Sequence, residues 1–420
     1  MKISILHYAT PPIVGGVEST IYHHSRLLTQ AGYQVNILSG KGEQFNQEIA
    51  VHLIPEIGSR NKSISEINQR LSRGEIPEEF INLRDMLYQE LSKIIKTTQV
   101  LIVHNALTLH KNLALTAALK LIADEKNTNM VAWCHDFAWQ DSLYTPDLHP
   151  GYPWELLRTP WPGVQYVTVS DHRRIRLAKL LNIPESNIEL IPPGVDAYEF
   201  LGLSTFSRKL IEKLKLLEAE PLILLPARIT RRKNIEFAIR VIALLKRDYP
   251  MTKLIVTGPP GPHNPQNIAY LNSLKSLRKE LGVETNVEFL YEASDDDEVL
   301  IIPDNVISDF FRIADILLFP SKREGFGIPV LEAGLVRMPV FASDIAPVHE
   351  SSADTAYLFD PAGAPDSVRD KIASFIESDR AYKLRRNVLS KFTWDSILKN
   401  KIIPLLDSFA DKNGNNSSKT

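Results

Sequence analysis

Residues 321–334 constrain the fold of this chain more than any other segment. The apolar run at 314–320 leads into them, and its short, continuous form with a terminal proline is typical of a buried strand. Two glycines then flank Phe326 and allow positive φ or a close backbone approach to a ligand. Pro329 suits the first turn of a helix. The segment therefore predicts a strand, a glycine loop and a helix whose first N–H groups form an anion site at the strand's carboxyl end.

Two acids belong to this segment, with seven residues between them. Glu324 is predicted in the loop and Glu332 in the first turns of the helix. The pattern resembles the signature of the retaining glycosyltransferases of family 4, also called group 1. The resemblance implies that Glu324 faces the donor sugar, that Glu332 binds the nucleotide ribose, and that the backbone of Gly325, Phe326 and Gly327 lies near the sugar and diphosphate. The alternative is an ordinary strand-loop-helix with surface acids.

Two cations follow an earlier buried strand, predicted at residues 222–228. Arg228 offers a planar fork and Lys233 a compact charge, both opposite the start of a helix, which suits a diphosphate. The family resemblance implies that this pair neutralises the leaving nucleotide diphosphate. A pair of surface cations is the alternative. Arg231 and Arg232 are expected to be solvent-exposed or structural.

The N-terminal segment reads as a β-α-β unit, with strands at 3–6 and 33–38 around a helix at 17–30. Its first turn contains Gly15 and Gly16 but lacks the Gly-x-Gly-x-x-Gly fingerprint, so the sequence gives NAD chemistry little support. The family resemblance implies that Gly15 and Gly16 lie beside the donor phosphates and the acceptor pocket. A tight turn that needs glycine is the alternative.

A histidine and an aspartate end the strand predicted at residues 130–137. Family members often have a histidine here, so the resemblance implies that His135 orients a sugar hydroxyl or the reacting oxygen, with Asp136 as a polar contact. A hydrogen-bonded histidine that closes a strand is the alternative. Residues 58–98 are helical in pattern, with a cap expected at Ser63 or Ser65.

Composition limits the partners. A net charge of −2 gives no overall basic field, so nucleic acid is not expected. The single cysteine, Cys134, excludes an internal disulfide and fits a reducing compartment, so the cytoplasm is expected. No apolar run approaches the length of a membrane span, and peripheral membrane contact stays open. The acidic run at 294–298 is expected to be a solvated loop and not a metal site.

The predicted fold is α/β, with two Rossmann-like, doubly wound domains facing across a cleft, the GT-B arrangement of the resembled family. The expected parts are an acceptor-side domain at 1–193, a nucleotide-sugar-binding domain at 194–391, a helix at 392–410 that crosses back to the first domain, and a disordered tail at 411–420.

The resemblance implies transfer of a glucosyl- or mannosyl-type hexose, with retention, from a UDP- or GDP-sugar to a hydroxyl of a sugar, glycan or small acceptor, without metal or other cofactor. Alternatives are a nucleotide-sugar epimerase, a pyridoxal-phosphate phosphorylase of the same fold, and a non-catalytic nucleotide-sugar-binding protein. A dehydrogenase ranks last because the glycine fingerprint is absent.

Overall fold

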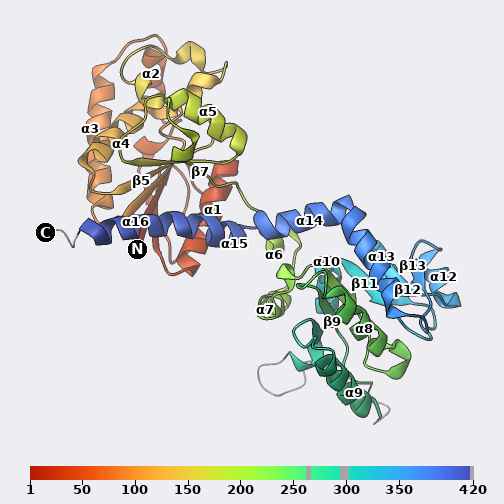
Figure 1. Cartoon of the computed structure of the whole chain (residues 1–420). Coiled ribbons are helices and arrows are strands. Elements are labelled where there is room, and N and C mark those ends of the chain that lie inside the picture. The colour runs from red at the N-terminus through yellow and green to blue at the C-terminus, as the bar shows by residue number, and fades with distance from the viewer. Residues whose placement is uncertain (262–265, 294–301, 417–420) are drawn as a thin grey trace. The chain divides into compact units, whose positions relative to one another are not determined.

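The chain divides into two compact units (Figure 1). Unit 1 comprises Met1–Val195 together with Phe392–Thr420, and unit 2 comprises Asp196–Lys391. The structure is a computed structural model that describes residues 1–261, 266–293 and 302–416. The acidic run at 294–298 lies outside these described residues.

Unit 1 is built on a parallel sheet of strand order β3-β2-β1-β4-β5-β6-β7. Its strands are β1 Lys2–His7, β2 Gln34–Ser39, β3 Ala50–Leu53, β4 Val100–His104, β5 Asn129–Cys134, β6 Val164–Thr168 and β7 Ile188–Leu190. The central strands are apolar on both faces because helices cover both faces. The strand order reverses between β1 and β4, and ligands of doubly wound sheets bind at such a switch point.

Helices pack on both faces of this sheet (Figure 1). Alternate residues of a strand face opposite sides: Leu101 packs with α3 and α4, whereas Ile102 packs with α1. The side chain of Asn61 caps α2 by accepting from the Ser63 N–H, so the cap expected at Ser63 or Ser65 lies at the preceding asparagine. The α-helices in the N-terminal part of unit 1 are α1 Gly16–Gln30, α2 Lys62–Leu71, α3 Glu78–Ile95, α4 Leu113–Glu125 and α5 Asp171–Leu181.

The C-terminal segment returns to unit 1 and packs on the α1 face of its sheet, which confirms the predicted crossing back (Figure 1). It consists of α15 Trp394–Ile397, a π-helical turn Leu398–Ile402 and α16 Ile403–Asn416. Trp394 is 4% exposed, stacks on the His23 ring at 5.1 Å and meets the His24 ring edge-on. Helix α16 extends through six residues of the tail expected to be disordered, 411–416.

Unit 2 contains a second parallel sheet, of strand order β10-β9-β8-β11-β12-β13. Its strands are β8 Leu222–Leu225, β9 Lys253–Val256, β10 Val287–Phe289, β11 Ile316–Phe319, β12 Val340–Ser343 and β13 Tyr357–Phe359. The order reverses between β8 and β11, so this unit has its own switch point. Two doubly wound parallel sheets confirm the predicted α/β class with two Rossmann-like units.

The helices of unit 2 also form two layers. Helices α8, α9 and α13 cover one face of the sheet, and α7, α10, α11 and α12 cover the other. The helices are α6 Ala197–Phe200, α7 Thr205–Leu214, α8 Ile235–Leu245, α9 Gln266–Glu280, α10 Asp304–Ile313, α11 Ile328–Leu335, α12 Ala346–Ser352, α13 Pro365–Ser378 and α14 Arg380–Lys391. Across both units, no helix in the described part of the chain is long and apolar enough to cross a membrane.

Candidate functional site

The switch point of unit 2 holds a buried ion pair. Lys233 Nζ lies 2.6 Å from Glu324 Oε1, and the two side chains are only 10% and 8% exposed. Lys233 follows β8 and Glu324 follows β11, so the pair joins the two strands between which the order reverses. The Lys233 ammonium also lies 5.2 Å from the centre of the Phe319 ring. Two of the predicted site residues therefore meet where open sheets bind ligands.

The other arginines around β8 have different surroundings. Arg232 Nη1 lies 3.4 Å from Glu324 Oε2, so this residue, expected to be solvent-exposed or structural, is a second cation on the same carboxylate. Arg231 stands over the Tyr270 ring at 5.1 Å, a structural contact. Arg228 is exposed after the end of β8 and makes no ion pair with any residue that the structure describes.

Backbone contacts hold the two loops of the ion pair together. Lys233 ends a 3-10 turn and is followed by Asn234, which is buried at φ +53°. Asn234 Nδ2 donates to the Pro361 carbonyl at 3.1 Å, which fixes this left-handed residue. The Lys322 N–H donates to the Arg232 carbonyl at 2.8 Å and so connects the β11 loop to the β8 loop. The geometry of the pair is therefore set by main-chain contacts as well as by charge.

The glycine loop leads from Glu324 into α11. Gly327 begins that helix at φ +98°, a conformation that favours glycine, and a Cβ there would lie 3.0 Å from Ser351 Oγ. No side chain of the described residues caps the first N–H groups of α11. Phe326 is 44% exposed, and the space where a Gly325 side chain would lie is empty. Glu332 is exposed on α11. The loop thus presents backbone N–H groups beside the ion pair.

Four histidines gather around the switch point of unit 1. His7, His104 and His135 come from the ends of β1, β4 and β5, and His24 comes from α1. His104 Nδ1 lies 3.2 Å from His135 Nε2, and His7 Nδ1 donates to the His104 carbonyl at 3.0 Å. The ring nitrogens of His24 have no hydrogen-bond partner among the described residues. The predicted His135 is therefore one member of a buried cluster.

Burial keeps this cluster neutral. It lowers the pKa of His7 and of His135 to about 4, and the Arg173 charge adds to the lowering at His135. Burial and the nearby His135 lower the pKa of His24 to about 3 and that of His104 well below its usual value. At neutral pH His135 can accept or donate a hydrogen bond but carries no charge.

We expect acid to unfold unit 1 through these histidines. Their folded pKa values lie below the unfolded value of 6.5, so the unfolded chain binds more protons as the pH falls from 6.5 toward 4. Their contribution to the free energy of unfolding is complete above pH 6.5 and is lost below it, by about 1.4 kcal/mol for each pKa unit of displacement.

Urea unfolding at about pH 7 and about pH 5 measures this loss. His24→Phe keeps an aromatic ring beside Trp133 and Trp394 without a titrating group, so its stability should fall less steeply than that of the wild type. If the free energy of unfolding fell equally between about pH 7 and about pH 5 in the wild type and in His24→Phe, the contribution of His24 to acid unfolding would be contradicted.

Asn105 positions the His135 loop. It is buried at φ +60°, and its Oδ1 accepts from the N–H groups of His135, at 2.8 Å, and Asp136, at 3.3 Å. The Asp136 carboxylate pairs with Arg173 at 3.2 Å, which gives the aspartate a partner within unit 1. The direction of the His135 side chain thus depends on a residue that the sequence analysis did not single out.

A cavity of about 500 Å³ opens at the carboxyl ends of β1 and β2. His7, Val14 and Glu18 line it, so it borders the predicted Gly15–Gly16 turn. A Cβ on Gly15 would overlap the Glu18 carboxylate, but this is the end of a flexible side chain, and Gly15 has an extended backbone at φ −176°, so neither feature requires glycine there. Glu18 Oε1 lies 4.0 Å from His7 Nε2. Gly16, in contrast, has open space around it.

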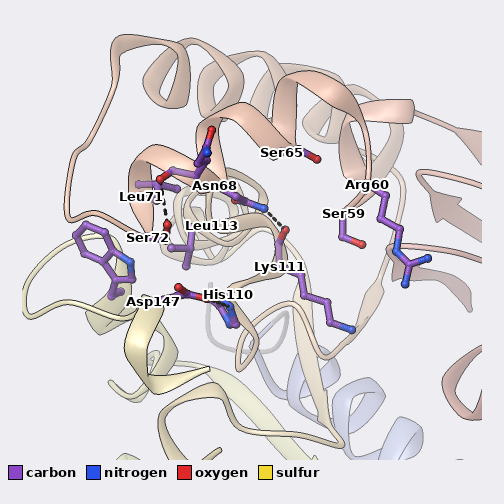
Figure 2. Close-up of a pocket in the computed structure, with 12 residues that line it drawn as sticks. Ser59, Arg60, Ser65, Asn68, Leu71, Ser72, His110, Lys111, Leu113 and Asp147 are labelled. Atoms are coloured by element: carbon purple, nitrogen blue, oxygen red, sulfur yellow. Dashed lines mark hydrogen bonds and ion pairs between the residues drawn. The ribbon is translucent and has the colours of Figure 1, made fainter. Parts of the chain in front are cut away.

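A second cavity, of about 470 Å³, adjoins the first, and the two share Ser59, Arg60 and Lys111 (Figure 2). It lies between α2 and the turn before α4, where Asn68 Nδ2 donates to the Lys111 carbonyl at 2.8 Å. Within the described part of the chain, no three metal-ligating side chains gather into a possible metal site.

Several residues of these sites were not predicted from the sequence. His7 ends a strand just as His135 does, so the same strand-end argument could have found it. Glu18, in the first turn of α1, carried the ordinary signal of a helix N-terminus. Arg60 and Lys111 carried none, because they meet only through folding of the helical region 58–98 against the turn before α4.

Comparison with known proteins defines the family. The model described as Glycosyltransferase Family 4 matches residues 14–199, and the model described as Glycosyl transferases group 1 matches residues 206–391. Together they cover most of both units. The chain belongs to the group 1 glycosyltransferases of family 4, and it is a glycosyltransferase.

Its relatives are distant. Mannosylglucosylglycerate synthase of Thermotoga maritima is 24% identical over 83% of this chain and 83% of its own length. A GDP-mannose-dependent alpha-(1-6)-phosphatidylinositol monomannoside mannosyltransferase of Mycobacterium tuberculosis is 26% identical over 58% of this chain and 62% of its own. Anabaena HepE in complex with UDP is a solved structure at 15% identity, with 97% and 100% coverage and a TM-score of 0.36.

Proposed function

We propose that this glycosyltransferase moves a hexosyl group from a nucleotide diphosphate sugar to a hydroxyl acceptor, with retention of the anomeric configuration. The observation that carries the proposal is the buried Lys233–Glu324 pair at the switch point of unit 2, beside the uncapped start of α11. A cation, a carboxylate and free N–H groups in one place suit a donor that has an anionic and a sugar part. The names of the relatives, which mention glucosyl and mannosyl groups, support glucose or mannose as the hexose.

Lys233 and Arg228 would receive the diphosphate. Breaking the bond between the anomeric carbon and the diphosphate oxygen leaves negative charge on the diphosphate, and fixed cations stabilise such charge as it forms. Lys233 is held in place before the donor arrives, by Glu324 and by the ring of Phe319. The exposed Arg228 has no competing ion pair among the described residues and is available to a phosphate. The N–H groups at Gly327 and the start of α11 would add to this anion site, and Glu332 would bind the ribose.

Glu324 would orient the sugar and not attack it. Its two oxygens already contact Lys233 and Arg232, which fix the carboxylate as a hydrogen-bond acceptor for sugar hydroxyls. On the acceptor side, neutral His135 would accept or donate a hydrogen bond to a hydroxyl at the reacting centre. Gly15 and Gly16 would let the acceptor and the donor phosphates approach the backbone at the start of α1.

The reaction needs no group beyond these. The acceptor oxygen forms a bond to the anomeric carbon on the face from which the diphosphate oxygen leaves. The acceptor proton passes to that leaving oxygen, so the products are the glycoside and the nucleoside diphosphate. This front-face course gives retention without a covalent enzyme intermediate, which agrees with a Glu324 already paired with cations.

Two measurements test the proposal without knowledge of the natural acceptor. In a thermal-shift panel with UDP, GDP and ADP, we expect one nucleotide to raise the melting temperature, because a ligand at about 100 Kd stabilises the folded state by about 2.7 kcal/mol. Slow hydrolysis of the matching α-linked sugar nucleotide, followed by proton NMR, should then release the α-hexose first. No stabilisation by any nucleotide, or initial release of the β-hexose, would overturn the proposal. Release of hexose 1-phosphate from an α-glucan and inorganic phosphate, with the shortened glucan as the other product and no nucleotide required, would favour a phosphorylase.

A further inference from the structure

We propose that the two adjoining cavities of unit 1 bind a small anionic acceptor, a sugar or polyol that carries a carboxylate or phosphate group, through Arg60 and Lys111 with Lys41 beside them. This inference rests on the proposed transferase function for its biological meaning, since it names the acceptor class of that reaction. Its structural basis is separate, because it depends on the cavities of unit 1 and not on the ion pair of unit 2.

The first observation is the charge of the cavity walls. Lys41, Arg60 and Lys111 line the cavities, and none of the three forms an ion pair with any of the described residues. Other arginines of unit 1 do have acidic partners: the exposed Arg70 pairs with Glu75 at 3.1 Å, and the half-buried Arg174 pairs with Asp171 at 2.6 Å. Three unpaired cations around one concavity leave a local positive field in a protein of net charge −2.

The second observation is that the acids in these walls lie beside histidines. Asp147 Oδ2 lies 3.9 Å from His110 Nε2, and Glu18 Oε1 lies 4.0 Å from His7 Nε2. In Figure 2, His110 and Asp147 lie together at one end of the second cavity, whereas Arg60 and the Lys111 ammonium lie toward its other side. Neither acid forms an ion pair with Arg60 or Lys111 in the described part of the chain, so these two cations can meet an external anion.

The third observation is size and polarity. Volumes of about 470 and 500 Å³ are in the range of small-molecule sites. Ser59, which lines both cavities, and Asn68 and Ser72, which line the second, supply hydroxyl and amide groups of the kind that bind sugar hydroxyls. The cation pair at the boundary and these polar groups beyond it match a molecule with one anionic group on a polyhydroxylated body.

Calorimetry on the full chain with three matched probes tests the inference. Glucose, glucuronate and glucose 6-phosphate share one ring and differ in charge. We expect one or both charged sugars to bind at least about tenfold more tightly than glucose, the gain from one charge-assisted hydrogen bond. Arg60→Gln and Lys111→Gln should each remove about that tenfold preference. Lys96→Gln, an exposed lysine in unit 1 outside both cavities, is the matched control and should bind as the wild type does.

The outcomes separate this inference from the proposed function. Binding of the nucleotide diphosphate, measured on the same variants, should not change, since that site is assigned to unit 2. If glucose binds as tightly as both charged sugars, if neither charged sugar binds, or if Arg60→Gln and Lys111→Gln leave their affinities unchanged, the inference is overturned even where the nucleotide binds. Sedimentation with phosphatidylcholine vesicles, with and without phosphatidylglycerol, distinguishes a lipid phosphate. If the protein instead binds the anionic vesicles, loses this binding in Arg60→Gln and binds neither charged sugar, that result would identify a lipid, and not a small acceptor, as the ligand of the cavities.

Discussion

Lys233→Ala is expected to lower the turnover number of sugar transfer by about 10²–10³-fold, the loss typical of one removed group that stabilises charge in a transition state. The ammonium lies 2.6 Å from Glu324 at the switch point of unit 2, where a leaving diphosphate would develop charge. Steady-state kinetics with saturating donor measures the loss. Arg232→Ala is the matched control, because this half-exposed cation contacts the same carboxylate at 3.4 Å. Arg232→Ala should lower the turnover number less than about tenfold, as expected for an exposed ion pair.

Stability must be measured beside activity, because removing one partner of a buried pair destabilises by about 3–5 kcal/mol. Lys233→Met with Glu324→Leu removes both charges together and should restore part of the melting temperature while leaving transfer absent. If the double variant is folded and active, or if Lys233→Ala is folded and fully active, Lys233 has no role in the transfer step.

Trp394→Ala is expected to lower the free energy of unfolding of unit 1 by about 3–5 kcal/mol, the usual cost of truncating a buried aromatic side chain to alanine. The indole is 4% exposed and contacts the rings of His23 and His24 on α1. Gly194 lies against it so closely that a Cβ there would come within 2.9 Å of the Trp394 ring. The truncation therefore opens a cavity at the place where the chain leaves and re-enters unit 1.

Urea unfolding followed by circular dichroism measures this loss. Trp394→Phe keeps part of the ring stacking and should cost less than the alanine variant. Leu384→Ala removes a 65% exposed side chain on α14 and should stay within about 0.5 kcal/mol of the wild type. A change of less than about 1 kcal/mol in Trp394→Ala would show that the C-terminal segment contributes little to unit 1.

The fold was largely predictable because its signals are local. Short apolar runs bounded by turns placed most strands within a few residues, and the strand predicted at 33–38 is observed at Gln34–Ser39. Strand β3 was not predicted because Ala50–Leu53 is a short, mostly exposed edge strand whose apolar residues are interrupted by His52. The cap at Asn61 was misplaced by two residues or more, because several polar residues in succession can each cap a helix.

The sequence predicted several residues of the site but not the contacts between them. The residue types and their places after strands pointed to Lys233 and Glu324, but their contact spans 91 positions of sequence and depends on strand order. The partners of His135 could not be foreseen for the same reason: His104 lies on another strand, and Asn105 positions the loop through a left-handed conformation that no pattern specifies. Periodicity reports burial along one element and says little about which elements become neighbours.

The return of the C-terminal segment has a consequence for biosynthesis. Unit 1 begins with the first residues of the chain, yet Trp394, Ile402 and Phe409 of its core come after the whole of unit 2. While the ribosome is still adding unit 2, the α1 side of the first sheet lacks the C-terminal segment, and the apolar surface that this segment later covers is open to non-native contacts. Unit 1 is therefore the first unit to be synthesised and the last to be completed. A chain that ends shortly before Phe392 would contain all of unit 2 but lack part of the core of unit 1.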